Sequence, residues 1–239
     1  MMPSNRFSRQ IATGLVSPEE QKALAKKTAA IVGLGGLGSV SAELILRCGV
    51  RKLILIDRDV VEQSNLSRQL YFEGDTGTAK AEALKTKLLK IDSKAKISAH
   101  AISLDASNAN VLKKADIILD GTDNMDARFL INEFALKNKI PWVYAAATGS
   151  VGATMNIVPE GPCFSCVFGT DTSPEACGVL GVINSATVAI TSFQVVEALK
   201  ILLGKRDVNR DLMYVDVWSG EMKKIRVMRR SSCGVCGEN

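Results

Sequence analysis

The sequence predicts an α/β fold with a mostly parallel sheet, and three observations lead to this prediction. Short apolar runs alternate with helical periodicities over roughly the first 150 residues, which is the pattern of βαβ units. A glycine-rich turn directly follows the first apolar run and opens a helix. The chain has 239 residues, of which 46% are hydrophobic, enough for one sizeable core. We therefore expect a Rossmann-like domain with additional C-terminal strands.

The expected elements follow one another in βαβ order. Strands are expected at residues 28–32, 52–56, 115–119, 142–146 and 151–158, and the last of these turns back on the sheet. Helices are expected from residue 38 to about residue 48, at residues 79–91 and at residues 124–137. The first strand, the glycine turn and the first helix form the opening unit of such a fold.

The chain after about residue 160 is expected to extend the same domain. Glycines and prolines break regular structure in the segment after Pro159. A long apolar helix follows at residues 182–203, and because polar side chains interrupt it, we expect a buried helix and not a membrane span. Two short strands are expected at residues 212–217 and 223–228. The prediction is one domain over residues 1–239, with an extension over about residues 160–239.

Composition and charge argue against several kinds of function. The chain has one histidine, His100, which argues against histidine catalysis and against metal sites with several histidines. The formal net charge of +5 is spread along the chain without a Lys/Arg block, so we expect acidic small molecules as partners and no nucleic acid. Residues 1–28 lack the apolar core of a secretory signal, and we expect a cytoplasmic protein without membrane association.

The glycine turn has the sequence GLGGLG, which fits the nucleotide-binding pattern G-x-G-x-x-G. Gly33 allows the tight turn, Gly35 lets the backbone approach a phosphate, and Gly38 lets helix and strand pack together. Gly36 belongs to the same run and is expected to contact the nucleotide too. Asp57 ends the second strand, where a carboxylate can accept hydrogen bonds from a ribose. A glycine-rich turn without a ligand is the alternative, and the context favours a nucleotide.

The residues after Asp57 indicate which nucleotide binds. Asn65, Arg68 and Lys80 place an amide and two cations before the next helix. Backbone N–H groups already serve a diphosphate, so the added cations favour a triphosphate over NAD. Asp123 follows the next apolar strand, at the edge where open α/β sheets bind ligands, and can hold Mg²⁺. The other readings are that Arg68 and Lys80 are surface charges and that Asp123 is a helix N-cap.

The cysteines form two C-x-x-C pairs, Cys163 with Cys166 and Cys233 with Cys236, which is the number and spacing of a Cys₄ zinc site. Four thiolates leave no open position for water, so we expect a structural Zn²⁺ that clips the C-terminal tail to the body. Redox disulfides are the alternative. Cys177 lies in the loop before the long helix, where a helix N-terminus could lower its pKa and make it nucleophilic.

Taken together, these residues resemble the E1-like adenylating enzymes of the ThiF, MoeB and HesA group, relatives of the ubiquitin-activating enzymes. The resemblance covers nearly the whole chain, in residues 6–10 (RFSRQ), 33–38, 55–59 (LIDRD), 65–69 (NLSRQ), Lys80, 120–124 (DGTDN) and the two cysteine pairs. It implies that a carboxylate attacks the α-phosphorus of ATP, giving an acyl adenylate and pyrophosphate. It also places Asp59 among the nucleotide contacts and implies a homodimer in which Arg6 of one subunit reaches the other's triphosphate.

The implied chemistry suits a chain almost without histidine. A terminal carboxylate has a pKa of about 3.3 to 3.7 and is ionised at neutral pH, so no general base is needed. The barrier is its repulsion from the triphosphate, which Mg²⁺, Arg6, Arg68 and Lys80 are expected to overcome. The expected catalytic set is completed by Asp123 and Cys177. Cys177 resembles the loop cysteine that ThiF-like enzymes use for persulfide or thioester chemistry, although some family members adenylate without covalent transfer.

The acceptor side is expected at residues 145–152 (AAATGSVG), a run of small residues beyond the Mg²⁺ position. Small side chains would let the Gly-Gly tail of a ubiquitin-like sulfur carrier lie against backbone, as the resemblance implies. Close packing of strand on helix is the other explanation of this run. The same channel could take a small-molecule carboxylate in cofactor biosynthesis, such as the pyridinol carboxylate of the methanogen iron-guanylylpyridinol cofactor.

Two further classes of function remain as alternatives. An NAD(P)-dependent oxidoreductase needs a proton donor near the hydride acceptor, and neither His100 nor a Tyr-x-x-x-Lys arrangement offers one. A catalytically silent dimeric binding module would keep the fold and the zinc without ATP turnover. The presence of Arg68, Lys80 and Asp123 argues against such a module.

Overall fold

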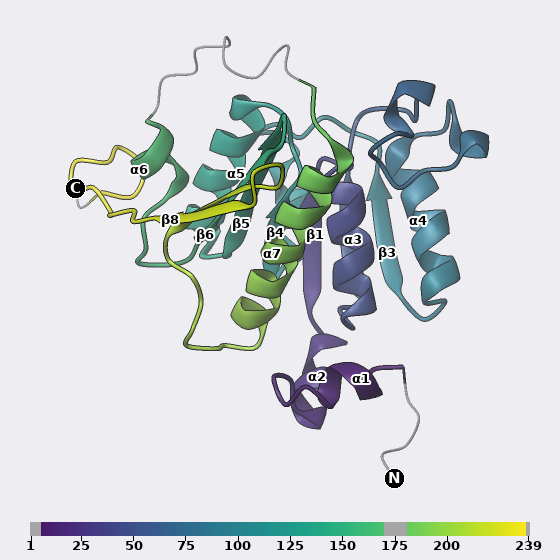
Figure 1. Ribbon diagram of the computed structural model, residues 1–239, viewed down its shortest axis with the longest axis horizontal. Coiled ribbons are helices and arrows are strands. Elements are labelled where there is room, and N and C mark those ends of the chain that lie inside the picture. Colours follow the sequence, from purple (N-terminus) through teal and green to yellow (C-terminus); the bar gives the residue numbers. More distant parts are fainter. Residues whose placement is uncertain (1–5, 170–180, 238–239) are drawn as a thin grey trace.

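The computed structural model describes residues 6–169 and 181–237. In this part of the chain, eight strands form one sheet in the order β3-β2-β1-β4-β5-β6-β7-β8 (Figure 1). The five strands from β3 to β5 are parallel, and β6, β7 and β8 are added antiparallel. The strands are β1 (Thr28–Val32), β2 (Lys52–Ile56), β3 (Lys96–His100), β4 (Ile117–Asp120), β5 (Trp142–Thr148), β6 (Val151–Ile157), β7 (Leu212–Asp216) and β8 (Glu221–Ile225). The prediction of a mostly parallel α/β sheet is confirmed.

Helices cover both faces of this sheet. On one face α3, α4 and α7 pack over the first core cluster, and on the other α5 and α6 pack over the second (Figure 1). The α-helices are α1 (Ser8–Ile11), α2 (Pro18–Leu24), α3 (Gly38–Arg47), α4 (Lys80–Ile91), α5 (Met125–Asn138), α6 (Phe164–Phe168) and α7 (Asn184–Leu202). Short 3₁₀ helices are η1 (Gln63–Asn65), η2 (Glu73–Asp75) and η3 (Ala109–Lys114).

Most of the expected elements lie within a few residues of their predicted positions. The strand expected at residues 115–119 begins only at Ile117, because Ala115 closes the 3₁₀ helix η3. The strand β3 was not predicted, because it is an edge strand whose residues are exposed or half-buried and lack an apolar run. The helix α2 was also missed, although Ser17 and Glu20 form a capping box ahead of its first turn.

The helix α7 is, among the described residues, long and apolar enough to cross a membrane by length and composition alone. Half of its most apolar window is nevertheless buried within the fold. Its buried Gln194 accepts a hydrogen bond from Ser41 and donates to the carbonyls of Asp120 and Val143. Because one polar side chain joins α7 to α3, β4 and β5, the expectation of a buried core helix is confirmed.

Candidate functional site

The glycine turn joins β1 to α3 at the carboxyl edge of the sheet, and its glycines have different surroundings. Gly33 has a φ of 79°, and a Cβ on Gly38 would overlap the carbonyl oxygen of Gly33. These two glycines are therefore required by the backbone itself. At Gly35 a Cβ would meet only the Gln69 side-chain nitrogen, 3.7 Å away. The space above Gly35 is thus open to a ligand that approaches the backbone.

The N-terminus of α3 faces the same open space. No side chain caps it, and the N–H groups of Gly35, Gly36 and Leu37 have no acceptor within the described residues. Free N–H groups and the positive end of the helix dipole together make an anion-binding position. The local backbone is therefore suited to a phosphate group.

Asp57 is tied to the glycine turn. Its Oδ2 accepts a hydrogen bond from the Leu34 N–H at 2.6 Å, and its Oδ1 accepts one from the Asp59 N–H at 2.8 Å. Burial raises the pKa of the Asp57 carboxyl, an effect that these N–H groups and nearby Lys80 oppose. Carboxylate oxygens keep further lone pairs after these bonds, so the ribose-binding role stays an open prediction.

Lys80 is buried, so the reading that it is an ordinary surface charge is wrong. Its Nζ lies 3.0 Å from Oδ2 of Asp59, and its backbone N–H donates to the Asp59 carbonyl at 2.9 Å. Asp59 is exposed and also lies 3.6 Å from the Arg58 guanidinium. The ion pair of Lys80 and Asp59 therefore places one cation and one carboxylate close to Asp57 in the sequence and at the same sheet edge.

The loop at residues 65–69 packs against the glycine turn. A Cβ on Gly36 would lie 3.3 Å from the Arg68 carbonyl oxygen. Asn65 is buried, and its Oδ1 accepts a hydrogen bond from the Glu62 N–H at 3.1 Å. Arg68 is half-buried and donates from Nη1 to the Ser64 carbonyl at 2.9 Å. The structure thus places the loop that carries Asn65 and Arg68 beside the turn.

Asp123 follows β4 at the same edge. It is exposed and, among the described residues, makes no ion pair. The reading of Asp123 as the cap of the next helix is wrong, because Asn124 is the N-cap of α5 and accepts from the Ala127 N–H at 2.9 Å. A Cβ on Gly33 would lie 2.6 Å from the Gly121 carbonyl oxygen, so the loop carrying Asp123 packs directly on the glycine turn.

Asp120 and Arg128 lie under this loop as a buried ion pair. Arg128 Nε is 3.2 Å from Asp120 Oδ2, and the Thr122 N–H and hydroxyl donate to Asp120 Oδ1 at 2.8 and 2.7 Å. Burial raises the pKa of Asp120, which Arg128 opposes. Arg128 was not predicted as a site residue, since arginines on helices are mostly exposed. An acidic residue ending a buried strand was the available signal, because it needs a partner.

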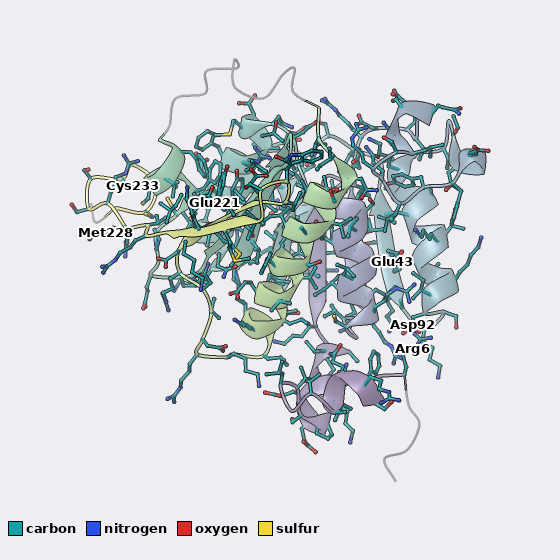
Figure 2. The ribbon with its side chains drawn as sticks, in the orientation of Figure 1. Arg6, Glu43, Asp92, Glu221, Met228 and Cys233 are labelled. Atoms are coloured by element: carbon teal, nitrogen blue, oxygen red, sulfur yellow. The ribbon has the colours of Figure 1, made fainter. Side chains whose placement is uncertain are left out.

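Arg6 lies away from the candidate nucleotide-binding residues of its own chain. Its Nη1 is 2.9 Å from Asp92 Oδ2, beyond the end of α4, where Arg51 also contacts Asp92 at 2.7 Å (Figure 2). Arg51 directly precedes β2, so this cluster belongs to the amino edge of the sheet. Within one chain, Arg6 therefore does not join the set at the carboxyl edge, and its contact with a second subunit stays an open prediction.

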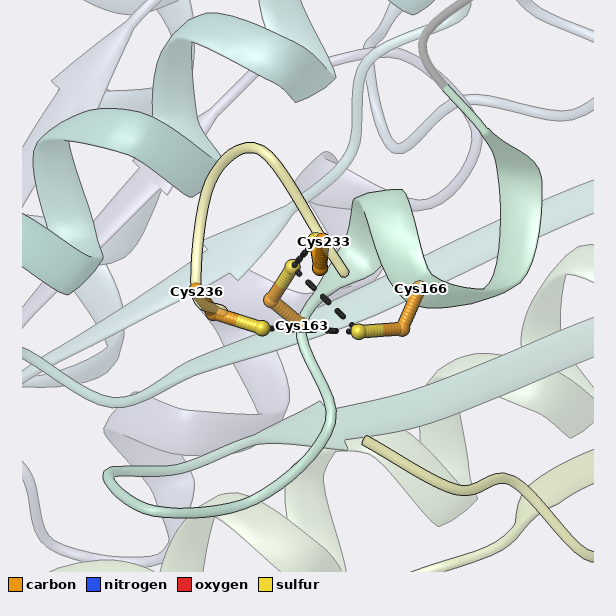
Figure 3. Close-up of side chains that lie close together, drawn as sticks. All are labelled: Cys163, Cys166, Cys233 and Cys236. Carbon is orange, nitrogen blue, oxygen red and sulfur yellow. Dashed lines mark hydrogen bonds between the residues drawn. The ribbon is translucent and has the colours of Figure 1, made fainter. Parts of the chain in front are cut away.

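The four paired cysteines converge from segments 70 residues apart (Figure 3). Their Sγ atoms all lie within 4.8 Å of one another. Three of the six separations are 3.9 Å for Cys163–Cys166, 3.7 Å for Cys163–Cys233 and 3.4 Å for Cys166–Cys236. Burial raises the pKa of the Cys163 thiol. Burial also acts to raise the pKa of Cys233, but hydrogen bonds with the N–H groups of Cys236 and Val235 and with the Cys163 and Cys236 thiols together outweigh it and lower the pKa to about 6. Cys177 lies outside the described residues.

The small residues of the expected acceptor run form the hairpin of β5 and β6. A Cβ on Gly152 would lie 2.6 Å from the Ile190 side chain on α7, so at this position close packing explains the glycine. Ala145 is buried, whereas Thr148 and Gly149 are exposed. The exposed end of the hairpin is therefore the part of the run that is open to a substrate.

Comparison with known proteins places the chain in a family. The sequence model of the ThiF family matches residues 7–235. The sulfur carrier protein ThiS adenylyltransferase of Bacillus subtilis is 36% identical, over 98% of this chain and 72% of that protein. The SAMP-activating enzyme E1 of Haloferax volcanii is 31% identical, over 98% of this chain and 89% of that enzyme.

Two further matches are a relative about twice as long as this chain and a solved structure that is similar in fold alone. The adenylyltransferase and sulfurtransferase MOCS3 of Drosophila willistoni is 34% identical over 97% of this chain, which spans 53% of that protein. The structure of E. coli MccB with ATP has a TM-score of 0.87 at 21% identity, over 99% of this chain and 75% of that one. At that identity the likeness shows the fold. The extent of the family match, together with the relatives from Bacillus subtilis and Haloferax volcanii, each more than 30% identical and covered over more than two thirds of its length, establishes that this chain is a member of the ThiF family of E1-like adenylyltransferases.

Proposed function

We propose that this chain uses ATP to convert a carboxylate into an acyl adenylate with release of pyrophosphate, and that the carboxylate is the C-terminal glycine of a ubiquitin-like sulfur carrier. The observation that carries this proposal is the meeting of three loops at one sheet edge, the glycine turn, residues 65–69 and residues 120–124. The relatives named for the activation of ThiS and SAMP support the choice of a carrier.

The nucleotide would lie across these loops. The N–H groups of Gly35 and Gly36 and the end of α3 would hold phosphate oxygens, next to backbone required by Gly33 and Gly38. Asp57 would accept hydrogen bonds from the ribose hydroxyls. Further contacts are proposed for Asp59, Asn65, Arg68 and Lys80. Since Lys80 already pairs with Asp59, the triphosphate would compete with a carboxylate for that cation.

Asp123 is suited to act as a Mg²⁺ ligand. Its carboxylate is a hard oxygen donor, and it is exposed at the sheet edge without a competing ion pair in the described part of the chain. Mg²⁺ typically binds through one or two carboxylates plus substrate phosphates, which suits a single aspartate beside a triphosphate. When bound, the ion would neutralise phosphate charge.

The residues of this chain would act by charge and alignment. The incoming carboxylate is already ionised at neutral pH, so none of them needs to remove a proton. Lys80 and Arg68 would reduce its repulsion from the triphosphate, as would Arg6 of a second subunit. One carboxylate oxygen bonds to the α-phosphorus, and the bond from that phosphorus to the departing pyrophosphate breaks. Cys177 is proposed to act afterwards, in transfer of the activated acyl group.

The cysteine cluster fits Zn²⁺. A tetrahedral site with Zn–S bonds near 2.3 Å requires Sγ atoms about 3.8 Å apart. Three of the six separations, at 3.4 to 3.9 Å, surround this value, and all six lie within 4.8 Å. We propose a structural Zn²⁺ that joins the tail to α6, so that residues 1–239 form one adenylation domain with an extension from about residue 160. Thiolate ligands of this kind suit the reducing cytoplasm.

A homodimer is part of the proposal. Val188 and Val196 are exposed to 41% and 50% on the outer face of α7 and would be covered by a second copy. The dimer would also bring Arg6 of one copy to the triphosphate of the other. Arg6 can serve this role only in that way, because it lies at the opposite edge from its own nucleotide residues.

Exchange of labelled pyrophosphate into ATP tests the proposal. The purified chain is mixed with Mg²⁺-ATP and, in separate reactions, with ubiquitin-like carriers ending in Gly-Gly and with small aromatic carboxylic acids. We expect exchange that depends on a carrier, and the Cys177→Ala variant should keep this exchange and lose only later acyl transfer. Exchange with a small acid alone would reassign the acceptor. Tight binding of NAD without binding of ATP would contradict adenylation altogether.

A further inference from the structure

We propose that Asp120 and Arg128 form a buried positioning pair that fixes the loop carrying Asp123, and that this pair sets the affinity of the nucleotide site for Mg²⁺-ATP. The inference rests on the proposed function for the identity of the ligand. Neither side chain reaches the open space at the sheet edge, since Asp120 is 0% and Arg128 is 4% exposed. Their effect on the ligand would therefore pass through the loop.

The pair holds the loop through Thr122. The Thr122 N–H and hydroxyl both donate to Asp120 Oδ1, at 2.8 and 2.7 Å. The Thr122 carbonyl accepts a hydrogen bond from Arg128 Nη2 at 2.6 Å, while Arg128 Nε lies 3.2 Å from Asp120 Oδ2. Both polar groups of the Thr122 backbone are thus fixed by one ion pair. Asp123 is the next residue.

The guanidinium group of Arg128 suits this task. Its planar fork directs Nε to a carboxylate and Nη2 to a carbonyl at the same time, which a lysine ammonium cannot reproduce in the same plane. The group also lies 5.2 Å from the ring centre of Tyr144 on β5. Arg128 therefore fixes the loop relative to the strand that leads into the acceptor hairpin.

The other side of the loop is held as well. Gln194 donates to the Asp120 carbonyl at 2.8 Å, and Gly121 packs on the Gly33 carbonyl. Asp123 itself has only one side-chain contact among the described residues, a 3.4 Å hydrogen bond from the Asn124 side chain. The position of its carboxylate is therefore determined by the loop backbone, and hence by the pair beneath it.

Stability alone is a weak reason for such a pair. Taking two ions out of water costs free energy that their attraction often fails to recover, and apolar replacements are frequently as stable. An oriented backbone beside a metal ligand is a stronger reason, because groups that orient metal ligands change metal affinity about 10- to 100-fold when they are mutated.

The experiment measures ATP binding by calorimetry at a series of Mg²⁺ concentrations and in EDTA, using the full chain. The variants are Arg128→Lys, Asp120→Asn and the milder Thr122→Val, which removes one hydroxyl bond. We expect the Mg²⁺ concentration for half-maximal enhancement of ATP binding to rise at least about 10-fold in the first two variants. Binding in EDTA should change less than about 3-fold, because the glycine turn is untouched. Hydrogen exchange of the amides at residues 121–124 should become faster.

The matched control is Glu197→Gln. Glu197 is also buried and paired, with Lys200 Nζ at 2.9 Å and the Asn156 amide at 2.7 Å, but it lies toward the amino edge of β5. This variant should lower the melting temperature and leave the Mg²⁺ dependence unchanged.

The proposal is overturned if folded Arg128→Lys and Thr122→Val proteins show the wild-type Mg²⁺ dependence, or if Glu197→Gln shifts it equally. These two variants decide the question if Asp120→Asn does not fold. ATP binding can be measured without an acceptor. An absence of pyrophosphate exchange with every carboxylate would therefore contradict the proposed function and leave the measured Mg²⁺ dependence of ATP binding unaffected. A wild-type chain that binds no ATP would overturn both.

Discussion

The glycines of the turn between β1 and α3 show how one residue type serves two purposes. At Gly33 and Gly38 a side chain would collide with neighbouring backbone, so these glycines are needed before any ligand binds. At Gly35 a side chain would enter open space beside uncapped N–H groups. The absence of a side chain at Gly35 is therefore best explained by a ligand that must come close to the backbone.

Alanine substitution separates these two purposes. Gly35→Ala should leave the melting temperature within about 3 °C of wild type, because its Cβ meets nothing closer than 3.7 Å, and should weaken ATP binding at least about 10-fold. Gly38→Ala should cost about 3 kcal/mol or more of unfolding free energy, because its Cβ overlaps backbone. Thermal melts and calorimetry check both values. Equal ATP affinity in wild type and folded Gly35→Ala would show that the turn does not hold the phosphates.

At the scale of elements, the sequence was informative where an apolar run had clear ends. The strands β1 and β2 have the predicted bounds, because each ends in a four-residue apolar run that is buried in the parallel sheet. The strand β3 was missed because an edge strand pairs on one side only and keeps polar residues such as Lys96 and Ser98. The hydrophobic pattern of a segment reveals where it is buried, and few residues of β3 are buried enough to produce such a pattern.

The same limit applies to the candidate site. The motif residues were found because glycines, carboxylates and cysteines have recognisable spacing. Arg128 was not found, since its role depends on tertiary contacts with Asp120, Thr122 and Tyr144 that no spacing rule describes. The pairing of Lys80 with Asp59 was likewise beyond sequence reasoning, which could name both residues but not their contact.

The link between the tail and α6 gives a prediction about metal. Freshly purified protein should contain about one zinc per chain, and removal by a chelator should free the tail, because the thiolates that hold it would repel one another. The melting temperature should fall by roughly 10 °C, corresponding to about 3–5 kcal/mol for a domain of this size. Faster hydrogen exchange at Arg230, whose N–H donates to Cys166, would report the loosening directly.

A matched cysteine variant controls the metal experiment. Cys166→Ser should reproduce the effect of the chelator, whereas Cys48→Ala should not, because Cys48 is the C-cap of α3, half-buried against the core and outside the cluster. Protein that is zinc-free on purification and unaffected by chelator would contradict a structural metal site.

The whole molecule presents its nucleotide residues at one edge of the sheet and Arg6 at the other. A site that requires both can form only between two chains, as in a dimer with two-fold symmetry. The exposed apolar residues of α7 offer surface for such a contact. In the proposed dimer, catalysis would depend on this contact, and mixing of inactive chains tests the dependence.

Arg6→Ala and Asp123→Ala should each abolish pyrophosphate exchange as homodimers. Co-refolded in equal amounts, they should regain about a quarter of the wild-type rate, because half of the dimers are mixed and each mixed dimer has one site with both residues intact. Gel filtration of the mixture serves as the control for assembly. Persistent inactivity of well-formed mixed dimers would show that Arg6 does not act across the interface.

The central claim is that a carboxylate of the acceptor attacks ATP at this site. The measurement that tests it most directly is pyrophosphate exchange with a carrier ending in a free Gly-Gly carboxylate, compared with the same carrier amidated at its C-terminus. The amide is neutral and presents no carboxylate to the α-phosphorus, so the account predicts rapid exchange with the free acid and exchange at background level with the amide. Equal exchange with both carriers, or none with any carboxylate while ATP is bound, would contradict it.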